Sequence, residues 1–195
     1  TGNVIPGATG TVYLCATVTS PANATSGDTP VVFTVTSAGT GLSDSMTDQV
    51  TVNTVRNVSF TPDRTGQVAP GGSATYTHIL TNNGNTTVGA GANLLPFTIG
   101  TVGNLGSTTS VYVDLNNNGR TDANELVTGN DLTARLEGNS PGATGNAAIA
   151  GLQPGESVTI VVKVQAPTNA APGQADTATV TNNPTGSTAI SINDT

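Results

Sequence analysis

The chain has 195 residues, a formal net charge of −7 and an isoelectric point near 4.2. Only 9% of its residues are charged, against about 25% in an average soluble domain, and its five basic residues are scattered. This composition excludes an electropositive surface for nucleic acid or anionic lipid. The absence of an apolar run of about 18 residues predicts no membrane-spanning helix.

The first elements along the chain are three short strands. Residues 12–18 alternate between apolar and polar side chains, and the pairs Phe33/Val35 and Val50/Val52 repeat this period of two. Cys15 lies within the first of these strands, and we interpret it as a small apolar residue that forms no internal disulfide, because it is the one cysteine.

The same pattern returns near the end of the chain. Residues 5–28 match residues 152–174, and the apolar positions of both segments coincide in phase. Further along, Phe33 and Val35 match Ala178 and Val180, and the pair Val50/Val52 matches Ile190/Ile192. The chain therefore contains an internal repeat.

The repeat sets the predicted domains. Residues 1–54 form the C-terminal part of one module, and residues 55–195 form a complete module whose first strands lie near Val58 and at residues 74–80. Short strands separated by turns about every ten residues indicate an all-β fold of antiparallel sandwiches. The first module is incomplete, since it lacks counterparts of residues 55–151. We expect either a longer polypeptide or another copy to complete it, and favour the former because the gap exceeds a single donated strand.

The segments QVAPGGSATYTHILTNNGNTTV, LQPGESVTIVVKVQAP and PGQADTATVTNN carry a family resemblance. They resemble the immunoglobulin-like conserved-repeat modules of bacterial and archaeal cell-surface proteins. The resemblance implies tandem immunoglobulin-like antiparallel β-sandwiches, an extracellular or cell-surface location, and a role in surface layers or filaments. The chain departs from the family pattern in an insertion at about 88–146 and in His78, where an aliphatic residue is usual.

The insertion contains the segment VYVDLNNNGRTDANELVTG at 111–129, which gathers Asp, Asn and Glu side chains. Counted from Asp114 as position 1, oxygen-bearing side chains fall at positions 1, 3, 5, 9 and 12 and a glycine at position 6, which is the spacing of a Ca²⁺-binding loop. The main-chain carbonyl at position 7 completes the predicted ligands, which are Asp114, Asn116, Asn118, Arg120, Asp122 and Glu125.

Two neutral amides among these ligands predict the weak affinity of extracellular calcium modules. Strand-like flanks, VYV and ELVTG, predict a loop on a β-scaffold, in which the ion has a structural role. The alternative is an Asn/Gly-rich turn that matches the spacing by chance. Asp131 is a further carboxylate nearby, which we expect to be solvated.

No catalytic motif is present in the sequence, so we expect no enzyme activity. His78, flanked by Tyr76 and Leu80 on the same strand face, is interpreted as a core or strand-edge histidine with a hydrogen bond. Four Asn-X-Ser/Thr sequons begin at Asn23, Asn57, Asn85 and Asn193, and chance in an Asn/Thr-rich chain accounts for them equally well.

These observations favour a structural component of a bacterial surface layer or extracellular filament, stabilised by Ca²⁺. Uncharged strands lack the Lys, Glu or Pro that usually guard sheet edges, so the expected partners are other copies or other modules of the same surface protein. No nucleic acid or small-molecule substrate is expected. The alternatives are an adhesive module for glycan or host protein, disfavoured by the scarcity of aromatic residues, and an accessory domain of a larger secreted enzyme.

Overall fold

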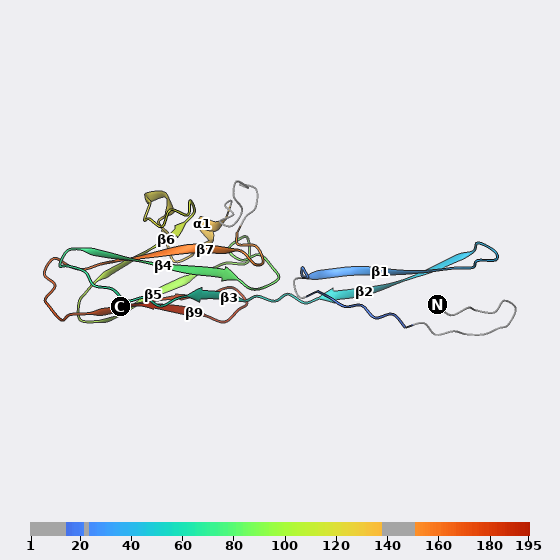
Figure 1. Ribbon diagram of the computed structural model, residues 1–195, viewed down its shortest axis with the longest axis horizontal. Helices are drawn as coiled ribbons and strands as arrows, with labels where there is room; N and C mark the ends of the chain where they lie inside the picture. The colour runs from blue at the N-terminus through green and yellow to red at the C-terminus, as the bar shows by residue number, and fades with distance from the viewer. Residues whose placement is uncertain (1–14, 22–23, 138–150) are drawn as a thin grey trace. The chain divides into compact units, whose positions relative to one another are not determined.

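A computed structural model describes residues 15–21, 24–137 and 151–195. The chain divides into two compact units, Thr1–Val52 and Asn53–Thr195, here called unit 1 and unit 2 (Figure 1). Among the described residues, all but two short helical turns of the named elements are β-strands, and the pairs that these strands form are antiparallel. The predicted all-β class is therefore confirmed. No helix among the described residues is long and apolar enough to cross a membrane.

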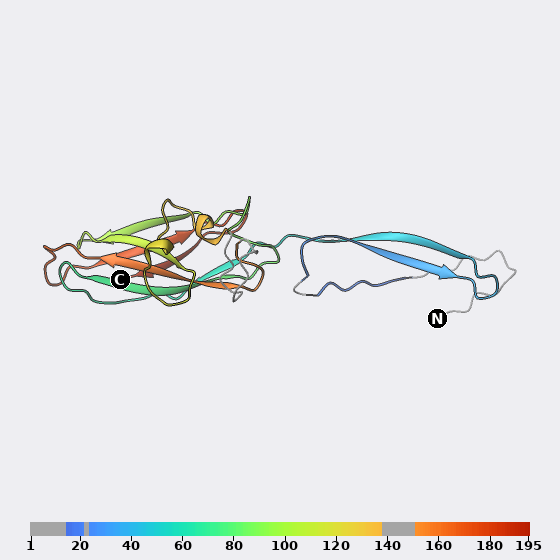
Figure 2. The ribbon, with the colours of Figure 1, turned by 90° about the horizontal axis from the view of Figure 1, so that it is seen from above.

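The described part of unit 1 contains a hairpin, drawn in blue and cyan in Figure 2, which is formed by β1 (Gly27–Thr36) and β2 (Ser43–Val52). Alternation gives the hairpin a polar face and an apolar face, because successive side chains point to opposite sides of a strand. Hydroxyl pairs cross the polar face: Thr34 contacts Ser45 at 3.0 Å, and Thr36 contacts Ser43 at 2.9 Å.

The strand predicted at residues 12–18 is not formed where the structure describes it. Residues 15–20 have no strand assignment, and residues 12–14 lie outside the described part of the chain. Cys15 is exposed rather than serving as a packed apolar residue, and Val18 is 50% exposed. The physical reason is that a half-buried strand needs partner strands, and the described residues of unit 1 supply only β1 and β2.

Unit 2 is a sandwich of two sheets with strand orders β3-β4-β7-β6 and β5-β8-β9. The first sheet contains β3 (Val58–Thr61), β4 (Ser73–Asn82), β6 (Thr108–Asp114) and β7 (Ser157–Gln165). The second contains β5 (Phe97–Gly103), β8 (Asp176–Asn182) and β9 (Ile190–Asp194). A 3₁₀ turn, η1 (Ala123–Glu125), and a single helical turn, α1 (Thr133–Leu136), follow β6.

The core of unit 2 lies between the sheets and consists of branched aliphatic side chains. Leu80, Val113, Ile160, Val180 and Ile192 are buried, each at an alternate position of its strand. Burial of each such side chain contributes about 1.5–3 kcal/mol relative to leaving it exposed. Few aromatic residues are needed because the interlocking side chains of both sheets fill the interior.

The insertion differs from its predicted form at two places. It adds a strand, β5, and the turn α1, whose Leu136 joins the core together with Leu95 and Leu132. The flank ELVTG was predicted as strand-like, but it begins within η1. It pairs with β6 through the isolated bridge Tyr112–Leu126 and forms no strand of its own among the described residues.

Candidate functional site

The loop between β6 and η1 holds the residues predicted to bind Ca²⁺. Asp114 ends β6 and is buried, and Glu125 ends η1 and is fully buried. The Val127 N–H donates to the Val111 carbonyl at 2.9 Å, so the chain returns alongside β6. This return brings the two ends of the loop together and places Glu125 beside residue 115.

Hydrogen bonds from the loop backbone hold its first half in shape. Asp114 Oδ1 accepts from the Asn118 N–H at 3.0 Å, and Asp114 Oδ2 accepts from the Gly119 N–H at 2.7 Å. The backbone is left-handed at Asn117, with φ of 57°, and at Gly119, with φ of 69°. Asn and Gly are the residues that adopt this conformation at least cost, so the sequence suits the turn.

Asp122 gathers the two loop asparagines. Its Oδ2 accepts from Asn116 Nδ2 at 2.9 Å and from Asn118 Nδ2 at 2.8 Å. These hydrogen bonds, from Asn116 first and then Asn118, lower the pKa of the Asp122 carboxyl, and the Arg120 charge adds to the effect. The carboxylate is therefore held ionised at the centre of the loop.

Glu125 has one carboxylate oxygen engaged and one free of hydrogen bonds. Oε1 accepts from the N–H groups of Leu115 and Asn116 at 2.9 and 3.3 Å. Oε2 is buried and has no hydrogen-bond partner among the described residues. A buried carboxylate oxygen without a donor is costly, so it is the feature of this loop that calls for a further ligand.

The six predicted ligand residues are thus close in space, but they do not form a finished cage. Among the described residues, no group of three or more His, Cys, Asp or Glu side chains is gathered tightly enough to hold a metal ion. The loop brings Asn116, Asn118 and Asp122 together, while Asp114 and Glu125 bind backbone N–H groups. The donor set of carboxylate, amide and carbonyl oxygens nevertheless fits a hard cation such as Ca²⁺. Asp131, expected to be solvated, accepts from the Thr133 N–H at 2.8 Å.

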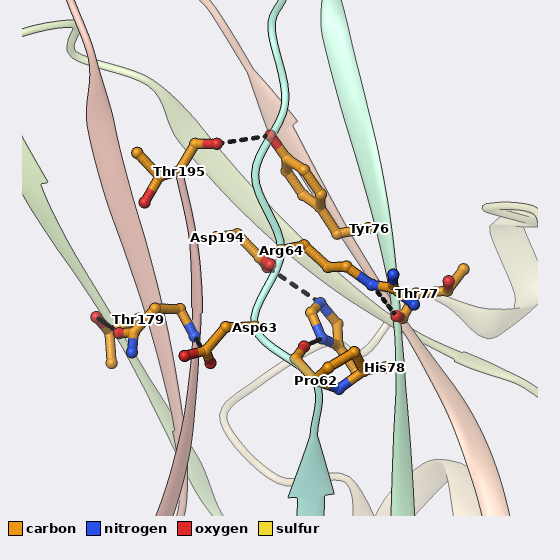
Figure 3. A network of polar contacts seen from close by, with 10 residues as sticks. Pro62, Asp63, Arg64, Tyr76, Thr77, His78, Thr179, Asp194 and Thr195 are labelled. Atoms are coloured by element: carbon orange, nitrogen blue, oxygen red, sulfur yellow. Dashed lines mark hydrogen bonds and ion pairs between the residues drawn. The ribbon is translucent and has the colours of Figure 1, made fainter.

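A second polar site lies around His78 on β4 (Figure 3). Its Nδ1 is 2.7 Å from the Pro62 carbonyl, and its Nε2 is 3.1 Å from Asp194 Oδ2. The interpretation of His78 as a buried, hydrogen-bonded residue is confirmed. Its partner Asp194 was not found, because no sequence signal links two residues 116 positions apart.

The contact with Pro62 shows which ring nitrogen of His78 carries a hydrogen. A carbonyl oxygen only accepts, so His78 Nδ1 carries the hydrogen of its contact with Pro62. Burial and the negative charge of Asp194 raise the pKa of the nearby Tyr76 hydroxyl.

Asp176 at the start of β8 organises the turn between β5 and β6. Its Oδ1 accepts from the Leu105 N–H at 2.9 Å, and its Oδ2 accepts from the N–H and hydroxyl of Ser107 at 2.7 and 2.8 Å. Burial opposes ionisation of this carboxyl, but the hydrogen bonds from Ser107 and Leu105 outweigh it and lower the pKa. Asp176 and Asp194 both border a cleft of about 550 Å³ at this end of the sandwich.

The sequons fall in different surroundings. Asn23 lies outside the described residues, whereas Asn57 and Asn193 are exposed. Asn85 is engaged in the fold, since its Oδ1 accepts from the Val55 N–H at 2.7 Å.

No protein-family model and no curated protein matches the chain. Among solved structures it is similar to domains 4 and 5 of the S-layer protein SbsC, with 14% identity over 85% of this chain and 56% of that one and a TM-score of 0.35. SbsC domains 1–6 give 16% identity over 87% and 16% of the two chains at a TM-score of 0.35. A family 123 glycoside hydrolase from Clostridium perfringens gives 5% identity over 71% and 26% at 0.35. The chain spans little more than half of the first of these structures and less of the others.

Proposed function

We propose that the chain is a structural β-module segment of a cell-surface layer or extracellular filament, and that Ca²⁺ bound by the loop at 114–125 stiffens its sandwich. The observation that carries the calcium assignment is the buried Glu125 Oε2, which has no hydrogen-bond partner among the described residues. A cation beside it would satisfy this oxygen and offset the repulsion between neighbouring carboxylates.

The residues that would hold the ion are those of the loop itself. Glu125, Asp114 and Asp122 supply negative charge, and the amide oxygens of the two asparagines and the Arg120 carbonyl supply neutral donors. The backbone hydrogen bonds to Asp114 already fold the loop at Gly119, so part of the ordering cost is met before binding. The ion would tie β6 to the segment that leads into α1.

Calcium would act on stability because the loop is joined to the core. The Arg135 Nε donates to the Leu126 carbonyl at 2.8 Å, and Leu136 on the same turn is fully buried. Binding to the folded state alone stabilises it by about 2.7 kcal/mol when free Ca²⁺ is 100 times the dissociation constant. The melting temperature of unit 2 in the full chain should therefore rise with added Ca²⁺ and fall with a chelator. An unchanged melting temperature would remove the calcium assignment.

The assembly part of the proposal is supported by sheet edges. β5 pairs only with β8 among the described strands, so its other edge is open. Its residues Thr98–Gly103 are exposed and uncharged, and Val102 is 77% exposed. An open, uncharged edge is a template for pairing with another strand. Electron microscopy of native material tests this: ordered sheets or fibres support it, and dispersed single molecules contradict it.

A further inference from the structure

The hairpin of unit 1 has an apolar face. Directly paired residues share a face of a sheet, and Phe33 pairs with Met46, Val31 with Asp48, and Val35 with Asp44. The same face continues toward the other end of the hairpin at Val50 and Val52. We define the apolar face as Val31, Phe33, Val35, Met46, Val50 and Val52.

In the part of unit 1 that the structure describes, this face is partly exposed. Val35 is 59% exposed and Met46 is 62% exposed, and both border a groove of about 860 Å³ that also includes Phe33 and Cys15. A two-stranded hairpin is marginally stable in water without a sheet or helix against its apolar side. The open face and the marginal stability together indicate that another element covers it.

The internal repeat identifies the covering element. Phe33 and Val35 are the sequence counterparts of Ala178 and Val180 in β8, and Val180 is only 2% exposed. In unit 2 the opposing sheet, β3-β4-β7-β6, packs over β8 and β9. Among the described residues, the strands of unit 1 that match β8 and β9 therefore lack the sheet that covers their counterparts.

We propose that the apolar face of β1 and β2 is an interface for a β half-module, namely a sheet with the strand pattern of β3, β4 and β6 and an aliphatic inner face. A second hairpin of this chain is a poorer occupant. Face-to-face stacking of two hairpins would place the Asp44 and Asp48 carboxylates of both copies in one apolar layer, where unpaired charge is strongly disfavoured.

The pairing register of β1 and β2 should differ between the exposed apolar face and a face covered by a second sheet. In unit 2, Val180 pairs with Ile192, whereas in unit 1 Val35 pairs with Asp44 and not with Val52, the counterpart of Ile192. The present register leaves Asp48 in the middle of the apolar face, which a covering sheet would bury. The register of β8 and β9 pairs Val35 with Val52 and moves both aspartates into the connecting loop. We therefore expect β1 and β2 to adopt this second register when a sheet covers the apolar face.

The test adds the half-module to the full chain. A second copy of residues 55–151 is fused ahead of Ile5, the counterpart of Leu152, and hydrogen exchange of the β1 and β2 amides is measured. We expect exchange to slow by about 100-fold relative to the unfused chain. The matched control carries Leu80→Asp in the added copy only, which removes a core residue of the added sheet and should restore fast exchange.

Engineered disulfides between β1 and β2 distinguish the two registers directly. In a Cys15→Ser background, the pair Val35→Cys/Val52→Cys should form a disulfide in the fusion, and Val35→Cys/Asp44→Cys should form one in the unfused chain. Three results would overturn the inference: slow exchange of β1 and β2 in the unfused chain, no slowing in the fusion, or protection that rises with the concentration of the unfused chain. All these measurements concern unit 1, so they are independent of the calcium loop.

Discussion

The imidazole of His78 and the carboxylate of Asp194 lie 3.1 Å apart, and neither side chain is exposed to solvent. His78 belongs to β4 in one sheet and Asp194 to β9 in the other, so the contact joins the two layers of unit 2. The ring of Phe60 packs edge-on against the imidazole at 5.7 Å and helps to exclude water. The polar contact between His78 and Asp194 thus holds β9 against the other sheet within an aliphatic core.

The first prediction concerns this pair. Asp194→Ala leaves a buried imidazole without its partner and should lower the free energy of unfolding of unit 2 by about 1–3 kcal/mol. Urea denaturation of the full chain measures this, with the exposed Asp44→Ala as the control, expected within about 0.5 kcal/mol of the parent. The double variant His78→Leu/Asp194→Leu should be more stable than Asp194→Ala. Parent-like stability of Asp194→Ala would show that the contact contributes nothing.

The second prediction concerns acid stability. The pKa of Asp176 is lowered in the folded chain below its ordinary value of 3.8, despite burial, by hydrogen bonds from Ser107 and Leu105. The folded state thus binds the proton less readily than the unfolded state. The resulting stability is complete above pH 3.8 and is lost as the pH falls through the folded value.

Urea denaturation between pH 2 and pH 6 measures this dependence. Asp176→Asn should lower the free energy of unfolding at neutral pH by about 1–3 kcal/mol and should flatten the acid limb. An acid limb equal in the parent and the variant would contradict this role of Asp176.

The third prediction separates backbone strain from metal binding. Gly119 has φ of 69° and Gly91 has φ of 55°, and a Cβ at either position would meet nothing within 4 Å. Alanine at either site should therefore cost about 1–2 kcal/mol from the left-handed backbone alone. Only Gly119→Ala should also weaken Ca²⁺ binding, as followed by titration calorimetry. Equal calcium affinity of the two variants would mean that the turn at Gly119 does not shape the site.

The fourth prediction concerns the open edge of β5. Val102→Lys places a charge on an exposed edge position and should reduce self-association of the chain, measured by light scattering over a concentration series. Val55→Lys is the control, since Val55 is also exposed but lies outside the strands. Melting temperatures of both variants should stay within a few degrees of the parent. Unchanged self-association of Val102→Lys would exclude this edge as the contact.

Much of unit 2 follows from its sequence because its strands alternate with a period of two. The inward residues of β4, β7 and β8, such as Leu80, Ile160 and Val180, are the apolar residues of that pattern. β5 could not be predicted because Thr98–Gly103 are exposed and uncharged. A strand of this kind shows little alternation between apolar and polar residues. Exposure in unit 1 could not be predicted either, since Val35 has the same pattern as Val180 and differs only in what covers it.

The polar sites were predictable only where their residues lie close together in the sequence. The spacing of the calcium loop locates Asp114 and Glu125, but it does not reveal that Glu125 Oε1 is held by backbone N–H groups while Oε2 is not. The pair His78–Asp194 depends on two sheets meeting, so it emerges only with the tertiary structure.

The most direct test of the account is calorimetric titration of the full chain with Ca²⁺. We expect one site with a dissociation constant of about 10⁻⁴–10⁻³ M, the range of extracellular modules. Glu125→Gln should abolish the binding heat, and Glu137→Gln, which removes one charge from an exposed side chain outside the loop, should leave it unchanged. No binding heat in the parent chain, or equal heats in the two variants, would show that the loop at 114–125 does not bind Ca²⁺.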